Sequence, residues 1–230
     1  MPRSVFITGT DTGIGKTQAS VALLRAIEAR GHRAAGMKPV ASGCEWIDGR
    51  WSNEDARALR SATRLQPPYA LTNPYPLRDA VAPHLAAAAQ GITLELEPIQ
   101  AAYEALRAET DCVVVEGAGG WCVPLSAALM QADIPSALAL PVILVVGLRL
   151  GCINHGLLSA RAIRADGFEL LGWIGNVIDP QQPLQADNVL TLRDRLDVPC
   201  LGLLPHGPVD AVRLDDALAA LGAAPLARRR

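Results

Sequence analysis

The chain has 230 residues, half of them hydrophobic, which is enough for one large α/β domain with a substantial core. Its formal net charge of −2 argues against nucleic acid as a partner, because such partners select a basic surface. The five cysteines lie far apart and indicate neither a disulfide framework nor a zinc site, so we expect a reducing, cytoplasmic environment. No signal peptide is recognisable, and no apolar run is long enough to span a membrane.

The first predicted strand, residues 5–8, leads into a glycine-rich loop that ends in Gly15-Lys16-Thr17 and is followed by a helical pattern. This is the context of a phosphate-binding P-loop, in which backbone N–H groups and a helix N-terminus face the phosphates. We expect Lys16 to reach the β- and γ-phosphates and Thr17 to bind Mg²⁺. Five residues separate Gly9 from Gly15, one more than is common. The alternative is a glycine-rich turn with an exposed lysine.

A second strand is predicted over residues 33–40, and Lys38 lies near its carboxyl end. Lys16 and Lys38 are the only lysines of the chain, and both are expected at the edge of the sheet where the predicted strands end. A compact ammonium at such a position favours a functional role, with a lysine that extends to the surface as the alternative. The other elements expected before residue 111 are a loop over 42–52, a helix from Ser52 or Asn53 to 62, an irregular excursion over 66–83, and helices over 83–90 and 98–110.

The apolar run 112–115 predicts a strand that is buried on both faces, and Glu116 with several glycines follows it. Glu116 can hold Mg²⁺ directly or through water, or it can cap the glycine turn. Asp55 stands in the first helical turn, where the helix dipole favours an acid in any case, so the residues alone leave its role open. The elements expected further on are strands over 141–147, 170–178 and 200–204, and helices over 151–166, 184–196 and 212–221.

Strands therefore alternate with helices about six times, which predicts a doubly wound, mostly parallel sheet with helices on both faces. We expect one P-loop ATPase-type domain over 1–230, with a flexible tail over 223–230 that ends in three arginines. Ligands bind such sheets where the strands end. The residues expected to converge there are Lys16, Lys38, Glu116, Gly151 and Asn176.

Several further blocks, beside the P-loop, resemble the dethiobiotin synthetase family, whose P-loop has the same longer spacing. The resemblance extends from residue 5 to about residue 205. The blocks that carry it are 9–17, Gly36-Met37-Lys38-Pro39-Val40-Ala41-Ser42-Gly43, Asn73-Pro74-Tyr75, Val115 to Trp121, Leu144 to Gly147, Leu150-Gly151-Cys152-Ile153-Asn154-His155 and Gly172-Trp173.

The resemblance implies a P-loop fold, a homodimer, and a ligase reaction in biotin synthesis. In that reaction 7,8-diaminopelargonate, CO₂ (or bicarbonate) and ATP, with Mg²⁺, give dethiobiotin, ADP and phosphate. One amine takes up CO₂ as a carbamate, ATP phosphorylates the carbamate, and the second amine closes the ureido ring and expels phosphate. Such chemistry needs mainly positioning and charge stabilisation, because the substrate supplies its own nucleophiles.

The resemblance also implies roles for individual residues. Lys16, Lys38 and Thr12 would be catalytic, with Thr12 and Lys38 at the carbamate. Thr17, Asp55 and Glu116 would hold Mg²⁺. The nucleotide would contact Gly13, Ile14, Gly15, Lys16, Thr17, Gln18, Asp55, Glu116, Gly117, Ala118, Gly119, Asn176, Val177, Pro205, His206 and Gly207. The substrate would contact Ser42 and, across the dimer interface, the backbone of Gly151, Cys152, Ile153 and Asn154.

The match is weakest at the residues that would surround the base. Val177 follows Asn176 where some relatives have an acid, and we predict measurable turnover with CTP or GTP as well as ATP. One competing function is a partition or cell-division type regulatory ATPase, which usually carries a second lysine inside the P-loop, absent here. Another is the synthetase module of amidotransferases of corrinoid synthesis, which needs a glutamine-hydrolysing domain for which 230 residues leave no room.

Overall fold

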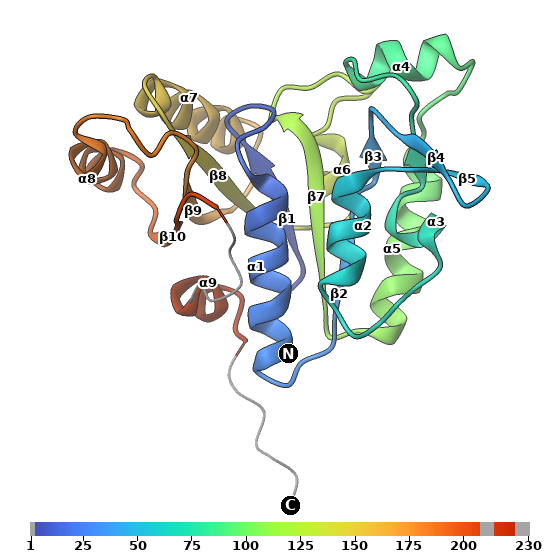
Figure 1. Cartoon of the computed structure of the whole chain (residues 1–230), viewed down its shortest axis with the longest axis horizontal. Coiled ribbons are helices and arrows are strands. Elements are labelled where there is room, and N and C mark those ends of the chain that lie inside the picture. Colours follow the sequence, from blue (N-terminus) through green and yellow to red (C-terminus); the bar gives the residue numbers. More distant parts are fainter. Residues whose placement is uncertain (1–2, 208–213, 224–230) are drawn as a thin grey trace, which may run out of the picture.

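The computed structural model describes residues 3–207 and 214–223. In these residues the core is a sheet of six strands in the order β10-β9-β8-β1-β7-β2, and every neighbouring pair in it is parallel (Figure 1). The strands are β1 (Val5–Gly9), β2 (Ala34–Met37), β7 (Cys112–Gly120), β8 (Val142–Leu148), β9 (Leu170–Val177) and β10 (Cys200–Leu204). The predicted doubly wound parallel sheet is confirmed.

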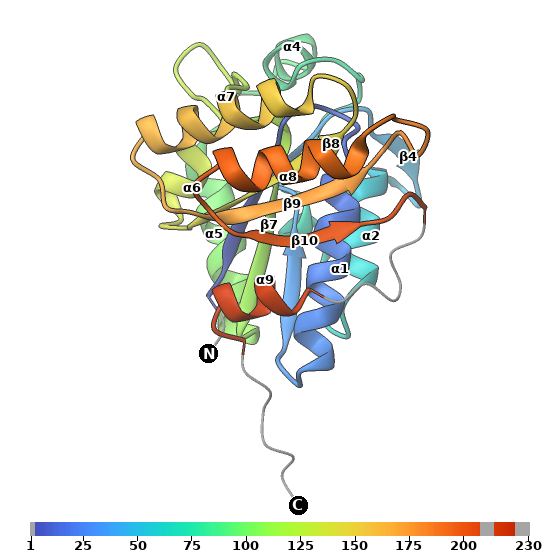
Figure 2. The same cartoon turned by 90° about the vertical axis from the view of Figure 1, so that its left-hand side faces the viewer.

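Helices cover both faces of this sheet, and each face has its own apolar core (Figure 2). One core includes residues of α1 (Lys16–Ala29), α2 (Glu54–Ser61) and α9 (Asp215–Ala220). The other includes residues of α4 (Pro83–Ala89), α5 (Leu96–Glu109), α6 (Asp133–Ala137), α7 (Cys152–Ala165) and α8 (Gln185–Arg195). Because both faces are buried, the central strands consist of near-continuous apolar residues rather than alternating ones.

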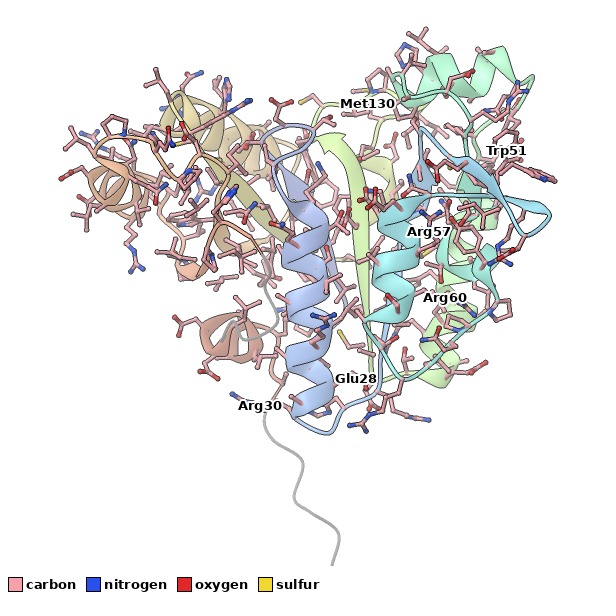
Figure 3. All side chains as sticks on the ribbon, viewed as in Figure 1. Glu28, Arg30, Trp51, Arg57, Arg60 and Met130 are labelled. Carbon is pink, nitrogen blue, oxygen red and sulfur yellow. The ribbon has the colours of Figure 1, made fainter. Side chains whose placement is uncertain are left out.

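Two expectations for the connection between β2 and α5 are wrong. The expected loop over 42–52 contains an antiparallel hairpin of β4 (Glu45–Ile47) and β5 (Arg50–Ser52). Asp48 and Gly49, both with positive φ, form its turn, and Trp51 projects on the outer side of the molecule (Figure 3). The expected irregular excursion over 66–83 contains α3 (Tyr69–Thr72) and β6 (Tyr75–Pro76), which pairs with β3 (Val40–Ala41).

Other predicted elements are confirmed with shifted ends. β7 continues through the glycine run to Gly120, because that run stays paired beside β1. Asn53 rather than Ser52 caps α2, and its side chain accepts a hydrogen bond from the backbone N–H of Ala56. The last helix begins at Asp215, and residue 212 lies outside the described residues.

At the C-terminal end, Ala223 is buried and donates its N–H to the Leu218 carbonyl. Residues 224–230 of the expected tail lie outside the described residues. Among the residues that the structure describes, no helix is both long and apolar enough to cross a membrane.

Candidate functional site

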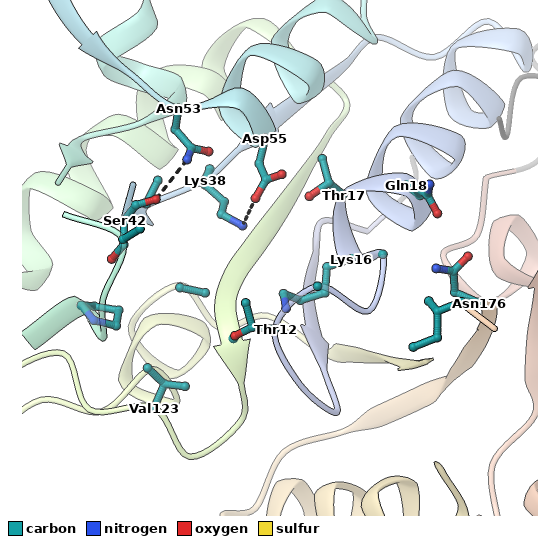
Figure 4. Close-up of a pocket in the computed structure, with 18 of the residues that line it drawn as sticks. Thr12, Lys16, Thr17, Gln18, Lys38, Ser42, Asn53, Asp55, Val123 and Asn176 are labelled. Atoms are coloured by element: carbon teal, nitrogen blue, oxygen red, sulfur yellow. Dashed lines mark hydrogen bonds and ion pairs between the residues drawn. The ribbon is translucent and has the colours of Figure 1, made fainter. Parts of the chain in front are cut away.

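A cavity of about 960 Å³ opens at the carboxyl ends of the central strands (Figure 4). We call its two parts the P-loop half and the Lys38 half. The P-loop half is lined by Thr12, Gly13, Gly15, Lys16, Thr17, Gln18, Asn176, Val177, Ile178, His206 and Gly207. The Lys38 half is lined by Lys38, Ala41, Ser42, Asn53, Asp55, Ala80, Val81, Ala82, Pro83, Ala118, Gly119 and Val123. The topology of the sheet explains where the cavity lies. At the carboxyl ends of β1 and β7, the connections that leave these two neighbouring strands run to opposite sides of the sheet.

The P-loop connects β1 directly to α1 and is held at both sides. Gly15, which precedes α1, has φ +87°, and a Cβ there would lie 2.0 Å from the amide nitrogen of Asn176. That amide nitrogen donates to the Ile14 carbonyl at 2.9 Å. On the other side, Asp11 pairs with Arg149 at 2.6 Å and its carbonyl accepts from the Lys16 ammonium at 2.8 Å. The loop conformation is therefore fixed by β9 and by the segment after β8.

Lys38 is the centre of the other half. Its ammonium donates to the Glu116 carboxylate at 2.6 Å and to the Gly117 carbonyl at 3.2 Å. It also donates to Asp55 at 3.1 Å (Figure 4). Lys38 and Glu116 are buried, whereas the Asp55 side chain is 43% exposed. Thr17 reaches the same cluster, because its hydroxyl donates to Glu116 at 2.8 Å. The two lysines of the chain thus line one cavity, as the sequence predicted.

Burial and charge shift the titration of this cluster. Burial lowers the pKa of Lys16 to about 8, and the nearby Lys38 ammonium adds to this effect. Burial also opposes the charge of Lys38, but Glu116 and Asp55 outweigh it and raise the Lys38 pKa above its usual value. Burial disfavours ionised Asp55 as well, yet the Lys38 ammonium holds the Asp55 pKa below its usual range. Lys38 is therefore a fixed cation, and Lys16 is the more easily deprotonated amine.

The donor set around Glu116 fits a hard divalent cation. One Glu116 carboxylate oxygen is buried and has no hydrogen-bond partner in the structure. Asp55 and the Thr17 hydroxyl stand beside the same Lys38–Glu116 cluster. No group of three or more His, Cys, Asp or Glu side chains that could hold a metal occurs within residues 3–207 and 214–223. A cation here would therefore complete its shell with phosphate oxygens or water, as Mg²⁺ commonly does.

Long-range hydrogen bonds hold Lys38 and its surroundings. The Lys38 backbone N–H donates to the Thr72 carbonyl at 2.7 Å, and the Asn73 amide donates to the Lys38 carbonyl at 2.7 Å. The Asn53 amide donates to the Ser42 carbonyl at 3.3 Å (Figure 4). The Ser42 hydroxyl is buried without a partner in the structure. That hydroxyl is therefore available to a ligand in the Lys38 half.

At the far end of the P-loop half, Asn176 presents one oriented group. Its amide nitrogen is used by Ile14, and its amide oxygen is buried without a hydrogen-bond partner in the structure. His206 lies beside it, with Nδ1 3.3 Å from the Val177 carbonyl. An acceptor with fixed orientation at this position can bind a ligand amino group.

The structure brings most of the sequence-predicted residues to the cavity and places others outside its lining. Glu116, Ile14 and Gly117 lie directly behind the wall and touch it through Lys38 or Asn176. Pro205 is exposed and is not part of the lining. The four residues at the start of α7 also do not line this chain's cavity: Gly151, Cys152, Ile153 and Asn154.

Sequence reasoning did not assign several residues that line the cavity. They are Ala41, Asn53, Ala80, Val81, Ala82, Pro83, Val123 and Ile178. Asn53 had a signal as a helix cap, but nothing in its local pattern showed that it also holds Ser42. The apolar residues 80–83 and Val123 approach the cavity only because two long connections fold over it, which no short motif encodes.

Known proteins resemble this chain over most of its length. A family profile described as an AAA domain matches residues 3–209. The ATP-dependent dethiobiotin synthetase BioD of Xanthomonas oryzae pv. oryzae (strain PXO99A) is 58% identical over 207 residues, covering 90% of this chain and 92% of that protein. The protein of the same name from Xylella fastidiosa (strain 9a5c) is 55% identical over 203 residues, covering 88% of this chain and 90% of that protein.

Solved structures with much lower identity share the architecture. Chloroplast FtsY from Physcomitrella patens has 18% identity and a TM-score of 0.54, covering 97% of this chain and 65% of that one. A chain of the MinC:MinD cell division protein complex from Aquifex aeolicus has 13% identity and a TM-score of 0.54, covering 97% of this chain and 87% of that one. At such identities the likeness concerns the fold alone, which is that of P-loop NTPases.

Proposed function

The chain belongs to the dethiobiotin synthetase family, and we propose that its cavity carries out the reaction for which that family is named. It is an ATP-dependent cyclo-ligase. In this reaction 7,8-diaminopelargonate, CO₂ and ATP give dethiobiotin, ADP and phosphate. The observation that carries the proposal is that both lysines of the chain line one cavity, Lys16 from the start of α1 and Lys38 from the position directly after β2.

The two halves of the cavity would divide the chemistry. In the P-loop half, backbone N–H groups and Lys16 would hold the triphosphate. Lys38, together with Thr12 of the P-loop half, would hold the substrate carbamate so that its oxygen attacks the γ-phosphorus. The P–O bond to ADP then breaks, and the carbamate becomes a mixed anhydride with phosphate. Positioning and charge stabilisation are the main demands of this step, and fixed ammonium groups meet them.

Ring closure would follow in the same place. The second amine of the substrate attacks the carbonyl carbon of the mixed anhydride, loses its proton and expels phosphate. No nucleophile from the protein is required, because both amines belong to the substrate. The unpartnered hydroxyl of Ser42 would hydrogen-bond the substrate, and the apolar residues 80–83 would contact its alkyl chain.

Magnesium is the metal that the donor set suits best. Thr17, Asp55 and Glu116 would hold it, and the unpartnered oxygen of Glu116 supports this assignment. A bound Mg²⁺ would neutralise negative charge on the phosphate oxygens during transfer. In the structure Lys38 pairs with the carboxylates of both Asp55 and Glu116. When Mg²⁺ and substrate bind, part of this ion pairing would be exchanged for contacts between Lys38 and the substrate.

The unpartnered amide oxygen of Asn176 would accept a hydrogen bond from the amino group of adenine. Cytosine also carries an amino group, whereas guanine presents a carbonyl oxygen on the corresponding edge. Because the Asn176 amide nitrogen is held by Ile14, the oriented amide favours CTP over GTP as the second nucleotide. Turnover measured with ATP, CTP and GTP at equal concentration tests this order.

A second copy of the chain would complete the substrate site. The start of α7 lies outside the lining of this chain's own cavity, and its glycine cap has φ +94°. Leu150 and Leu158, next to and on α7, are 91% and 54% exposed. We infer a homodimer in which each α7 N-terminus offers backbone N–H groups to the substrate carboxylate bound in the other subunit. A cytoplasmic location agrees with five free cysteines.

The proposal is tested by ADP release from ATP with and without 7,8-diaminopelargonate and ¹³C-bicarbonate. We expect ADP release to require both substrates and the ¹³C label to appear in the ureido carbonyl of the product. ADP release that is unaffected by the diamine, with no labelled product, would overturn the proposal. That result would favour a regulatory ATPase, a reading that the sequence does not favour because its P-loop lacks a second lysine.

A further inference from the structure

Gln131 is a buried residue outside the cavity lining that hydrogen-bonds two lining residues, Ala118 and Val123, and also Gly120. It is 1% exposed and stands just before α6. Its backbone N–H donates to the Val123 carbonyl at 2.8 Å. Its side-chain amide accepts from the Ala118 N–H and donates to the Gly120 carbonyl, both at 2.5 Å. Figure 3 labels the preceding residue, Met130, close to the carboxyl end of β7.

The fit between this amide and the end of β7 is tight. A Cβ on Gly117 would lie 2.7 Å from the Gln131 amide oxygen and 2.8 Å from its carbonyl carbon. The backbone there offers one N–H and one carbonyl, so it needs a partner that both accepts and donates. A primary amide meets both needs, whereas an apolar side chain of the same size would leave two polar groups unsatisfied.

The braced segment is the one that faces Lys38. The Gly117 carbonyl accepts from the Lys38 ammonium at 3.2 Å. Gly119 stands against Thr12, because a Cβ on Gly119 would lie 3.3 Å from the Thr12 hydroxyl. Gln131 therefore holds the backbone that sets where the Lys38 ammonium and the Thr12 hydroxyl can lie.

We infer that Gln131 is a positioning residue for the reaction: its amide fixes the Gly117–Gly120 backbone and thereby places Lys38 against the substrate carbamate. This inference rests on the proposed function of Lys38. It assigns Gln131 no contact with substrate or nucleotide. The P-loop backbone at Asp11 and Ile14 is held by Arg149 and by Asn176 of β9, so we expect ATP affinity not to depend on Gln131.

The test compares Gln131→Met with the matched control Gln100→Met. The side-chain amide of Gln100, on α5, donates to the Ala137 carbonyl at the end of α6. Gln100 therefore anchors the helix that follows Gln131, but it does so outside the cavity lining. We expect Gln131→Met to lower kcat about 10- to 100-fold, the range for residues that orient catalytic groups. The dissociation constant of ATP should stay within about twofold of the wild-type value. Gln100→Met should leave kcat within about twofold.

A second variant keeps the inference testable if Gln131→Met does not fold. Gln131→Glu has the same shape and still accepts from Ala118, but its carboxylate repels the Gly120 carbonyl. We expect it to fold, to bind ATP normally, and to lose kcat at least about tenfold. A kcat for either folded Gln131 variant that matches the Gln100→Met control would overturn the inference. Equal losses in ATP affinity and kcat would also overturn it, because they would indicate a general structural role.

The inference and the proposed function fail in different ways. Lys38→Ala with wild-type ADP release would remove Lys38 from the mechanism and with it the proposed function of that lysine. An inactive Lys38→Ala together with fully active Gln131 variants would overturn the inference about Gln131 alone.

Discussion

The two halves of the cavity are built in different ways. The P-loop half is built around one continuous segment, residues 12–18, in which Gly13 and Gly15 have positive φ, and residues 176–178 and 206–207 lie beside it. The Lys38 half is assembled from four separate segments, and hydrogen bonds between residues far apart in the sequence hold it. The first half is therefore built around one local motif that Asn176 and Arg149 hold in place, while the second is assembled entirely from distant connections.

Of the changes considered, replacing Lys38 should have the largest effect on stability. This effect should be confined to the Lys38 half. Glu116 is fully buried, and Lys38→Met would leave its charge without its main partner. Loss of one member of a buried ion pair costs about 3–5 kcal/mol. Urea unfolding measures this cost. Arg30→Met, which removes the surface pair with Asp215, is the control and should cost at most about 1 kcal/mol. Equal stability of the two variants would contradict the burial argument.

Gly15→Ala should damage the P-loop half alone. The new Cβ would meet the Asn176 amide nitrogen at 2.0 Å, in a backbone conformation that disfavours L-residues. We expect ATP to bind at least about 100-fold more weakly, roughly 2.7 kcal/mol. Gly13→Ala is the matched control, because Gly13 has φ +72° but, among the described residues other than its two chain neighbours, no heavy atom lies within 4 Å of the added Cβ. Calorimetric titration with ATP should show a clearly smaller loss for Gly13→Ala, and losses of equal size would show that backbone strain alone is responsible.

Asn176→Asp tests the base end of the same half. The carboxylate cannot donate to the Ile14 carbonyl, so the oriented acceptor would be lost while the shape of the side chain is kept. We expect the KM for ATP to rise about tenfold and the preference of ATP and CTP over GTP to shrink. Steady-state assays with the three nucleotides measure both. An unchanged order of preference would mean that Asn176 does not select the base.

Asn53→Ala should produce the smallest effect and should separate the halves again. It removes the cap of α2, which carries Asp55, and the bond to the Ser42 carbonyl. We expect the variant to lose about 1 kcal/mol of stability. Its KM for the diamine should exceed that of the wild-type protein, and its KM for ATP should be unchanged. Ser61→Ala, at the other end of the same helix, is the control. A rise in the KM for ATP alone would contradict the division of the cavity.

The same difference explains what the sequence could predict. The P-loop, the alternation of strands and helices, and the position of Lys38 directly after β2 follow from short patterns, because hydrophobic period and glycine spacing are local signals. Glu116 was expected at a strand end, but it lies within β7, which continues to Gly120. The hairpin β4–β5 and the approach of residues 80–83 were missed. Gln131 was missed as well, because its role arises only when a connection of ten residues folds back onto β7. Such contacts depend on tertiary packing rather than on local pattern.

The central claim is that Lys38 serves the reaction and not the binding of nucleotide. The most direct test measures ATP affinity and diamine-dependent ADP release on one preparation of Lys38→Met, below its unfolding temperature. We predict that ATP affinity stays within about threefold of wild type while ADP release falls at least about 100-fold, the scale for lost transition-state stabilisation by a preorganised donor. Diamine-dependent ADP release within twofold of wild type would contradict the account.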